Sequence, residues 1–216
     1  MSIALALCAS PGPCSCALRV ADGSLHEGES ASGSGMAVIV ENLFTMAKLS
    51  PQDLEEVRVD LGPGSYTGLR VAVTFARTLN EFHRADVLTC SSLELHAVAA
   101  WSHGLVPEGA TIRPVLDARR HRFHHAAFKL GETLSIELAP RATTAEELWD
   151  SIAEGDAVLA PEELHPKLEE AVSSRGATLH ATPEIKASLL FHAALAPRPT
   201  ASDELEPLYL MQSYAE

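Results

Sequence analysis

Residues 60–70 read DLGPGSYTGLR, a segment that combines three glycines with a proline and the hydroxyl side chains of Ser65 and Thr67. The residues before it, VRVDL at 57–61, alternate as in a β-strand, and LRVAVTFARTLNEF at 69–82 has helical spacing. The segment therefore predicts a strand, a tight turn and a helix. The glycines either supply the φ > 0 conformations of a sharp corner or let N–H groups at the helix start bind an anion.

Standard motifs with similar composition do not fit this turn. A dinucleotide fingerprint needs glycine at its first, third and sixth positions, but Thr67 takes the sixth position and Gly68 comes one residue late. A P-loop needs lysine and then serine or threonine after its last glycine, where this chain has Leu69 and Arg70. A nucleophile elbow needs a glycine two residues before and after its serine, which Ser65 lacks. Ser65 is therefore not expected to be a hydrolase nucleophile.

Composition indicates a soluble globular protein. With 216 residues, 46% of them hydrophobic, the chain can form one large domain or two small ones. Its apolar stretches are too short for a membrane helix, and the first residues lack the basic start of a signal peptide. We expect a cytoplasmic protein that does not bind membranes. Its four cysteines are then expected to be thiols.

The net charge of −13 argues against direct binding of nucleic acid, because that affinity depends on Lys and Arg neutralising phosphates. A role with nucleic acid would require a partner.

Strand and helix patterns predict an α/β fold in two lobes with mixed sheets. The expected domains are 1–105 and a smaller one at 106–216. As an alternative, the C-terminal segment returns to pack on the first lobe. The first domain is expected to contain strands at 2–8, 15–20, 25–30, 57–61 and 86–90, and helices at 36–49, 69–82 and 92–101. The second is expected to contain strands at 111–118, 123–130, 134–138 and 157–160, and helices beginning at 144, 161 and 185.

Histidines and cysteines offer candidate metal or redox groups, each with a plainer alternative. His121, His124 and His125 lie close together, but on a strand at most two of them share a face, so a solvated polar strand is the alternative to a metal site. Cys14 and Cys16 would also share one face, where they are either a redox or metal pair or small core residues.

Two carboxylates complete the candidates. Asp60 ends a predicted strand beside the glycine turn, where a catalytic role is conceivable. Asp117 with Arg119 and Arg120 forms either an anion site or a charged turn between two strands.

Four segments together resemble the TsaB family, a subunit of bacterial tRNA threonylcarbamoyladenosine synthesis. They are GPGSYTGLRVAVTFARTL at 62–79, CSSLELHA at 90–97, VLDARRHRFHHAAF at 115–128 and EPLYL at 206–210. The resemblance implies an actin-like, ribonuclease H-like nucleotidase fold in a subunit without catalytic residues. It also implies a TsaD-like catalytic partner and a TsaE-like ATPase, with ATP and magnesium at these partners and tRNA reached only through the complex.

The chain departs from the family at two positions. The first strand reads ALALCAS, which places Cys8 where the family has an aspartate. The segment SASGSG at 30–35 has Gly and Ser where the family has a histidine. A thiol does not replace a carboxylate in orienting hydrated magnesium, so we expect no ATP hydrolysis and no bound metal or cofactor. The glycine turn is then a structural corner, or an anion or nucleotide contact made by Gly62, Gly64, Ser65, Thr67, Gly68 and Arg70.

The helices at 36–49 and 69–82 have apolar arcs wider than one buried face; that of the second spans roughly 200°. We expect them to form half of a helix bundle with TsaD or with a second copy of this chain. The alternative is that both helices are covered within the monomer. If the helices form the bundle, Ala76→Arg should leave the monomer folded and prevent association, because the charge would be buried only in the complex. The predicted interface residues are Met36, Ile39, Val40, Leu43, Phe44, Ala72, Val73, Ala76 and Leu79.

Two other functions remain open. One is an active actin-like ATPase or phosphotransferase, against which the replacement at Cys8 argues. The other is a glycopeptidase-type hydrolase, for which the chain lacks an H-E-x-x-H zinc motif.

Overall fold

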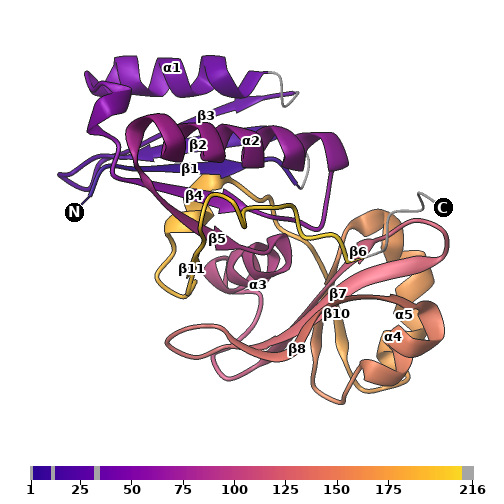
Figure 1. Ribbon diagram of the computed structural model, residues 1–216. Helices are drawn as coiled ribbons and strands as arrows, with labels where there is room; N and C mark the ends of the chain where they lie inside the picture. Colours follow the sequence, from indigo (N-terminus) through magenta and orange to yellow (C-terminus); the bar gives the residue numbers. More distant parts are fainter. Residues whose placement is uncertain (1, 11–12, 32–34, 211–216) are drawn as a thin grey trace. The chain divides into compact units, whose positions relative to one another are not determined.

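The computed structural model describes residues 2–10, 13–31 and 35–210 and divides the chain into two compact units. Unit 1 comprises residues 1–92 and 185–208, and unit 2 comprises 93–184 and 209–216 (Figure 1). Residues 32–34, part of the segment at which the resemblance implies a histidine, lie outside the described residues.

Unit 1 is built on a six-stranded mixed sheet with the order β11-β5-β4-β1-β2-β3. β1, β2 and β3 form an antiparallel meander, whereas β4 and β5 run parallel to β1. The strands are β1 (Ala4–Cys8), β2 (Cys14–Arg19), β3 (Leu25–Ser30), β4 (Glu56–Asp60), β5 (Asp86–Cys90) and β11 (Arg198–Pro199). The carboxyl ends of β1 and β4 lie side by side, since Leu7 pairs with Val59.

Two helices cover one face of this sheet, α1 (Met36–Ala47) over β2 and β3 and α2 (Tyr66–His83) over β4 and β1. Their apolar side chains join those of Leu5 and Leu7 in one buried cluster. The short 3₁₀ helix η2 (Pro51–Asp53) connects α1 to β4. Ser50 occupies its N-cap position, and the helix ends after one turn.

The predicted helix at 185–195 is wrong, because only a 3₁₀ helix, η4 (Ala187–Phe191), forms there. It lies on the opposite face of the sheet. Ser15 Oγ accepts a hydrogen bond from Ala187 N at 3.0 Å, and Arg58 Nη1 donates to Leu190 O at 2.9 Å. These contacts replace the hydrogen bonds that a continuous α-helix would supply.

Unit 2 has a five-stranded mixed sheet with the order β10-β9-β6-β7-β8. Helix α3 packs on one face, where its Leu93 and Ala97 contact a cluster that includes Phe128. α4 and α5 pack on the other face around Val115. The elements are α3 (Ser92–Ser102), β6 (Thr111–Asp117), β7 (Arg122–Lys129), β8 (Ser135–Thr144), α4 (Ala145–Ser151), β9 (Ala157–Ala160), η3 (Glu162–Leu164), α5 (His165–Ser173) and β10 (Thr178–Ala181).

The predicted α/β class with two mixed sheets flanked by helices is confirmed. The boundary differs from the expected residue 105, because unit 1 ends at Ser92 and nearly all of α3 belongs to unit 2. Residues 185–208 belong to unit 1. Across the part of the chain that the structure describes, every helix is too short or too polar to cross a membrane.

Candidate functional site

The glycine turn packs directly on the chain that follows β1. Gly62 has φ +93°, which a residue with a side chain rarely adopts. A Cβ on Gly64 would lie 2.4 Å from the carbonyl oxygen of Ser10, and one on Gly68 would lie 2.3 Å from that of Ala9. Glycine is therefore required at Gly64 and Gly68 by contact with protein backbone.

Ser65 forms the corner between the turn and α2. Its backbone N–H donates to Ser10 O at 3.0 Å, and its Oγ accepts from the N–H of Gly68 at 3.3 Å. This is an N-cap, which occupies one of the N–H groups that an anion would otherwise contact. The contacts fit the interpretation of a structural corner, while an anion contact at this helix start stays a prediction.

Asp60, at the end of β4, connects the turn to the end of β1. Its carboxylate is fully buried and accepts hydrogen bonds from Ser10 Oγ, from Gly62 N at 2.8 Å and from Cys8 Sγ at 3.5 Å. Burial raises the pKa of Asp60, although its hydrogen bonds act in the other direction. The Asp60 carboxylate therefore ties the glycine turn to the end of β1 through these hydrogen bonds.

Cys8 occupies the strand position at which the resemblance implies an aspartate. It is buried, and burial raises the pKa of its thiol well above the ordinary value, with the neighbouring Asp60 adding to the shift. Cys14 and Cys16 are also buried thiols in the core cluster of unit 1. Among the described residues, no three His, Cys, Asp or Glu side chains gather closely enough to hold a metal ion.

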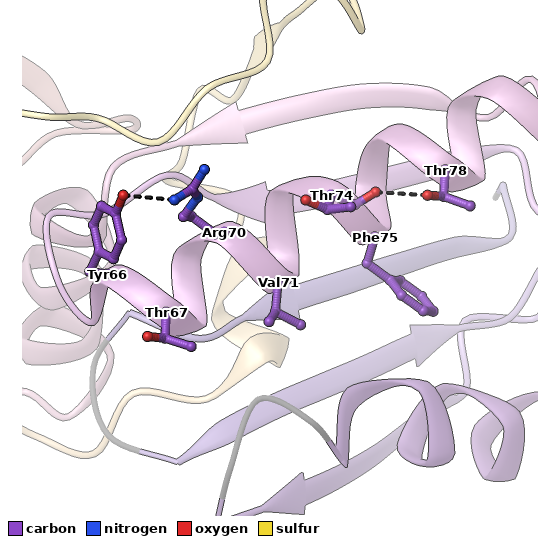
Figure 2. A pocket seen from close by; sticks show the side chains of 7 residues that line it. All are labelled: Tyr66, Thr67, Arg70, Val71, Thr74, Phe75 and Thr78. Atoms are coloured by element: carbon purple, nitrogen blue, oxygen red, sulfur yellow. Dashed lines mark hydrogen bonds between the residues drawn. The ribbon is translucent and has the colours of Figure 1, made fainter.

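The exposed side of α2 bears a hollow of about 510 Å³. Figure 2 shows Val71 and Phe75 on one side of this helix and Arg70 on the other, with its Nη1 donating to Tyr66 Oη at 2.7 Å. Arg70, a predicted anion contact, is thus held against Tyr66, and its guanidinium lies 5.2 Å from the centre of that ring. The hollow is lined by Tyr66, Thr67, Arg70, Val71, Thr74, Phe75 and Thr78.

The nine residues predicted to form the interface are instead part of the monomer's core. Each is at most 8% exposed, and all belong to the buried cluster between the two helices and the sheet. The prediction is wrong for these positions because the sheet and the neighbouring helix cover the same apolar stripes. They are Met36, Ile39, Val40, Leu43, Phe44, Ala72, Val73, Ala76 and Leu79.

Other apolar side chains of the two helices face solvent, and we call them, with the hollow on α2, the outer helix surface. Among the described residues of α1 and α2, the large hydrophobic ones that are more than half exposed are Val38 (59%), Met46 (62%), Tyr66 (59%) and Phe82 (72%). The width of the apolar arcs indicated that some apolar side chains of these helices would lie outside the core. The helical pattern did not show which side chains face the core and which face solvent.

A family model described as "TsaD: tRNA N6-adenosine threonylcarbamoyltransferase" matches residues 32–194, which is more than half of the chain. The chain belongs to the TsaD family. Within the TsaD family, the predicted resemblance to TsaB is confirmed by a relative in Bacillus subtilis (strain 168), the tRNA threonylcarbamoyladenosine biosynthesis protein TsaB. It is 35% identical over 101 residues, which cover 47% of this chain and 42% of the relative. The match thus spans less than half of the relative's length.

Two solved structures from Pseudomonas aeruginosa share the fold of this TsaD-family chain. One, described as an uncharacterized protein with similarity to peptidase YEAZ, has 20% identity and a TM-score of 0.79, covering 98% of this chain and all of its own. The other, YeaZ, has 21% identity and a TM-score of 0.78, covering 97% of this chain and all of its own. These similarities confirm the predicted fold class.

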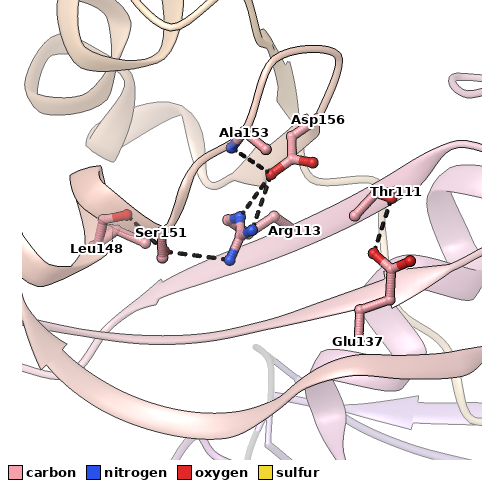
Figure 3. A network of polar contacts seen from close by, with 7 residues as sticks. All are labelled: Thr111, Arg113, Glu137, Leu148, Ser151, Ala153 and Asp156. Atoms are coloured by element: carbon pink, nitrogen blue, oxygen red, sulfur yellow. Dashed lines mark hydrogen bonds and ion pairs between the residues drawn. The ribbon is translucent and has the colours of Figure 1, made fainter.

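Unit 2 of this TsaD-family chain contains a buried ion pair that the sequence did not indicate (Figure 3). Arg113 donates to Asp156 Oδ2 from Nε at 3.0 Å and from Nη2 at 2.9 Å, and both residues are at most 5% exposed. Arg113 Nη1 also donates to Ser151 Oγ at 3.3 Å, and Asp156 Oδ2 accepts from Ala153 N at 3.0 Å. The pair fixes the end of α4 against β6 and β9.

The three clustered histidines have different environments. His121 lies in the exposed turn before β7, not on the strand, so it does not share a strand face with His125. His125 is fully buried, and its Nε2 lies 3.0 Å from Thr143 Oγ1. Burial lowers the pKa of His125 to about 4, and the nearby Arg113 adds to this shift. His124 is half-buried on the opposite face of the strand, and burial lowers its pKa as well.

The buried His125 side chain is expected to make the protein less stable in mild acid. Its folded-state pKa of about 4 lies below the ordinary 6.5, so between these values the unfolded chain binds a proton that the folded protein does not. Stability from this group is therefore present above pH 6.5 and is lost as the pH falls toward 4. Between pH 6.5 and 4, the free energy of unfolding of the His125→Gln variant should fall by about 2 kcal/mol less than that of the wild type.

Urea unfolding followed by tryptophan fluorescence measures this difference, because both tryptophans, Trp101 and Trp149, lie in unit 2. His121→Gln, in the exposed turn, is the control and should follow the wild-type pH profile. Parallel pH profiles for His125→Gln and wild type would contradict the assignment.

Proposed function

We propose that this chain is a non-catalytic subunit of tRNA threonylcarbamoyladenosine synthesis that binds a TsaD-like subunit through its outer helix surface. One observation carries the proposal: two neighbouring helices of a TsaD-family chain expose large apolar side chains to solvent. Val38 and Met46, eight residues apart on α1, lie on one stripe of that helix. Exposed apolar stripes of this kind are typical of protein interfaces. The hollow on α2 offers a concave seat for a partner side chain.

The side chains at the ends of β1 and β4 do not suit magnesium-dependent catalysis. Magnesium prefers oxygen ligands, whereas Cys8 presents a buried thiol that stays protonated. The carboxylate next to it, Asp60, accepts its hydrogen bonds from Ser10, Gly62 and Cys8 itself. These groups stabilise the turn, and ATP and magnesium are expected to bind at the partner subunits.

The remaining partners follow from charge and family. At physiological salt, a chain with a net charge of −13 is expected to reach tRNA only within a complex that supplies most of the basic surface. We propose a TsaE-like ATPase as the second partner and a cytoplasmic location for the complex. The outer helix surface also allows a homodimer of the isolated chain, in which each copy covers the same surface of the other.

The interface is tested by placing charges on α1. In the double variant Val38→Glu/Met46→Glu, two exposed apolar side chains become carboxylates that would be buried only in the complex. Affinity for the TsaD-like subunit of the same organism should fall on the order of 100-fold, while the fold is retained. Size-exclusion chromatography with light scattering and isothermal calorimetry measure the association, and circular dichroism checks the fold.

Ile136→Glu is the matched control, since Ile136 is 51% exposed on β8 of unit 2. It should bind the TsaD-like subunit as wild type does. Unchanged affinity of the folded double variant would overturn the interface. Self-association of the isolated chain that disappears in the double variant would show that the homodimer uses the same surface.

A further inference from the structure

The turn between β6 and β7 is the most basic surface feature of unit 2. Four consecutive residues, Arg119, Arg120, His121 and Arg122, are exposed there, and we call them the basic hairpin tip. Three arginines in four residues stand out in a chain with only 16 basic residues and a net charge of −13. Two carboxylates are near: Asp117 at the base of the turn, and Glu147, whose pKa is lowered by hydrogen bonds from Thr144 and, to a lesser extent, by the charge of Arg122.

The backbone of the tip is held in an unusual conformation. Arg119, Arg120 and His121 have φ angles of 64°, 50° and 60°, in the left-handed region that favours glycine. Hydrogen bonds fix this geometry: Asp117 Oδ1 accepts from Arg119 N at 2.7 Å, and Arg122 N donates to Arg119 O at 3.0 Å. Each of the three side chains therefore carries a steric cost that glycine would remove. Backbone outliers of this kind cluster at active sites and ligand-binding sites.

The chemistry of the side chains indicates the ligand. Guanidinium groups match phosphate oxygens in a two-pronged geometry and keep their charge at any physiological pH. The fixed turn presents Arg119 and Arg122 on a short, closed loop, which limits the ordering cost of a contact. In an otherwise acidic protein, this is a local contact for a polyanion and not a binding surface of high affinity on its own.

We propose that the basic hairpin tip contacts the phosphate backbone of the substrate tRNA. This inference rests on the proposed function, in which tRNA is brought to the chain by a complex. The tip adds phosphate contacts to those of the partner, with no selection among bases. RNA is favoured over an acidic protein surface because the family model describes a tRNA-modifying enzyme and because arginine forks suit phosphate.

The test uses nuclear magnetic resonance on the isolated chain, which detects weak contacts. An unmodified tRNA transcript is titrated into the ¹⁵N-labelled protein at low salt. Amide shifts should change in residues 117–124 and fade as salt is raised, because the contact is electrostatic. The double variant Arg119→Gln/Arg122→Gln should lose these changes. The control Lys129→Gln/Lys167→Gln removes the same charge from exposed positions on β7 and α5 and should retain them.

Absence of shift changes in the tip, or equal changes in the arginine double variant, would overturn the inference. Equal changes with poly-glutamate at matched charge would assign the tip to an acidic protein instead. In the assembled complex, the arginine double variant should weaken tRNA binding and reduce the slope of log K against log salt by about 1 per arginine. Failure of the complex to form would count against the proposed function, while the titration of the isolated chain still decides the role of the tip.

Discussion

Replacing Asp156 with alanine is expected to lower the free energy of unfolding of unit 2 by about 3–5 kcal/mol. The variant leaves the Arg113 guanidinium buried without its carboxylate, and burial of an unpaired charge is among the largest single-residue penalties. It also removes the acceptor for Ala153 N, which loosens the end of α4. Urea unfolding followed by the two tryptophans measures the change in unit 2.

A double variant separates the charge from the packing. Arg113→Met/Asp156→Leu removes both charges and should recover most of the loss, because apolar pairs often replace buried ion pairs without cost. A single variant as stable as wild type, or a double variant no better than the single one, would show that the pair is not the element that holds α4.

Replacing Ala76 with arginine is expected to unfold unit 1, with a cost of about 4 kcal/mol or more. Ala76 is fully buried against the sheet, and arginine cannot lose its proton to escape the penalty. This reverses the expectation from sequence, in which the same variant remained folded. Circular dichroism and thermal melting measure the effect.

Thr74→Arg adds the same charge two residues earlier, at an exposed position of α2, and should keep the wild-type melting temperature within a few degrees. A folded Ala76→Arg protein that fails only to bind its partner would restore Ala76 to the interface and contradict the burial described for it.

The two helices illustrate what periodicity predicts. It correctly gave α1, α2 and the strand, turn and helix around Gly62–Gly68, since each depends on local pattern and capping. It also showed that the apolar arcs are wider than one buried face. Periodicity did not indicate which part of each apolar arc the sheet covers, because that depends on how each helix is oriented over strands that are distant in sequence. The interface was therefore assigned to Ala72 and Ala76, whereas the exposed side chains include Val38 and Phe82.

Features fixed by distant contacts were not predictable. Arg113 and Asp156 are 43 residues apart, and nothing in either neighbourhood signals the pair. The segment at 187–191 has a helical pattern, but hydrogen bonds from β2 and β4 hold it as a single 3₁₀ helix. A charged turn at Asp117, Arg119 and Arg120 was one of the sequence alternatives, but no glycine marks its left-handed conformation or its extension to His121, which was expected on the strand.

The proposed role of this chain as a subunit required for threonylcarbamoyl transfer is tested by reconstituting the reaction from purified subunits. The TsaD-like and TsaE-like subunits of the same organism are incubated with tRNA, ATP, magnesium and the activated threonylcarbamoyl donor, with and without this chain. Threonylcarbamoyladenosine is then measured by mass spectrometry of the digested tRNA. We expect the modified nucleoside to form only when this chain is present, and Val38→Glu/Met46→Glu to abolish most of it. Equal modification without the chain would contradict the proposed role.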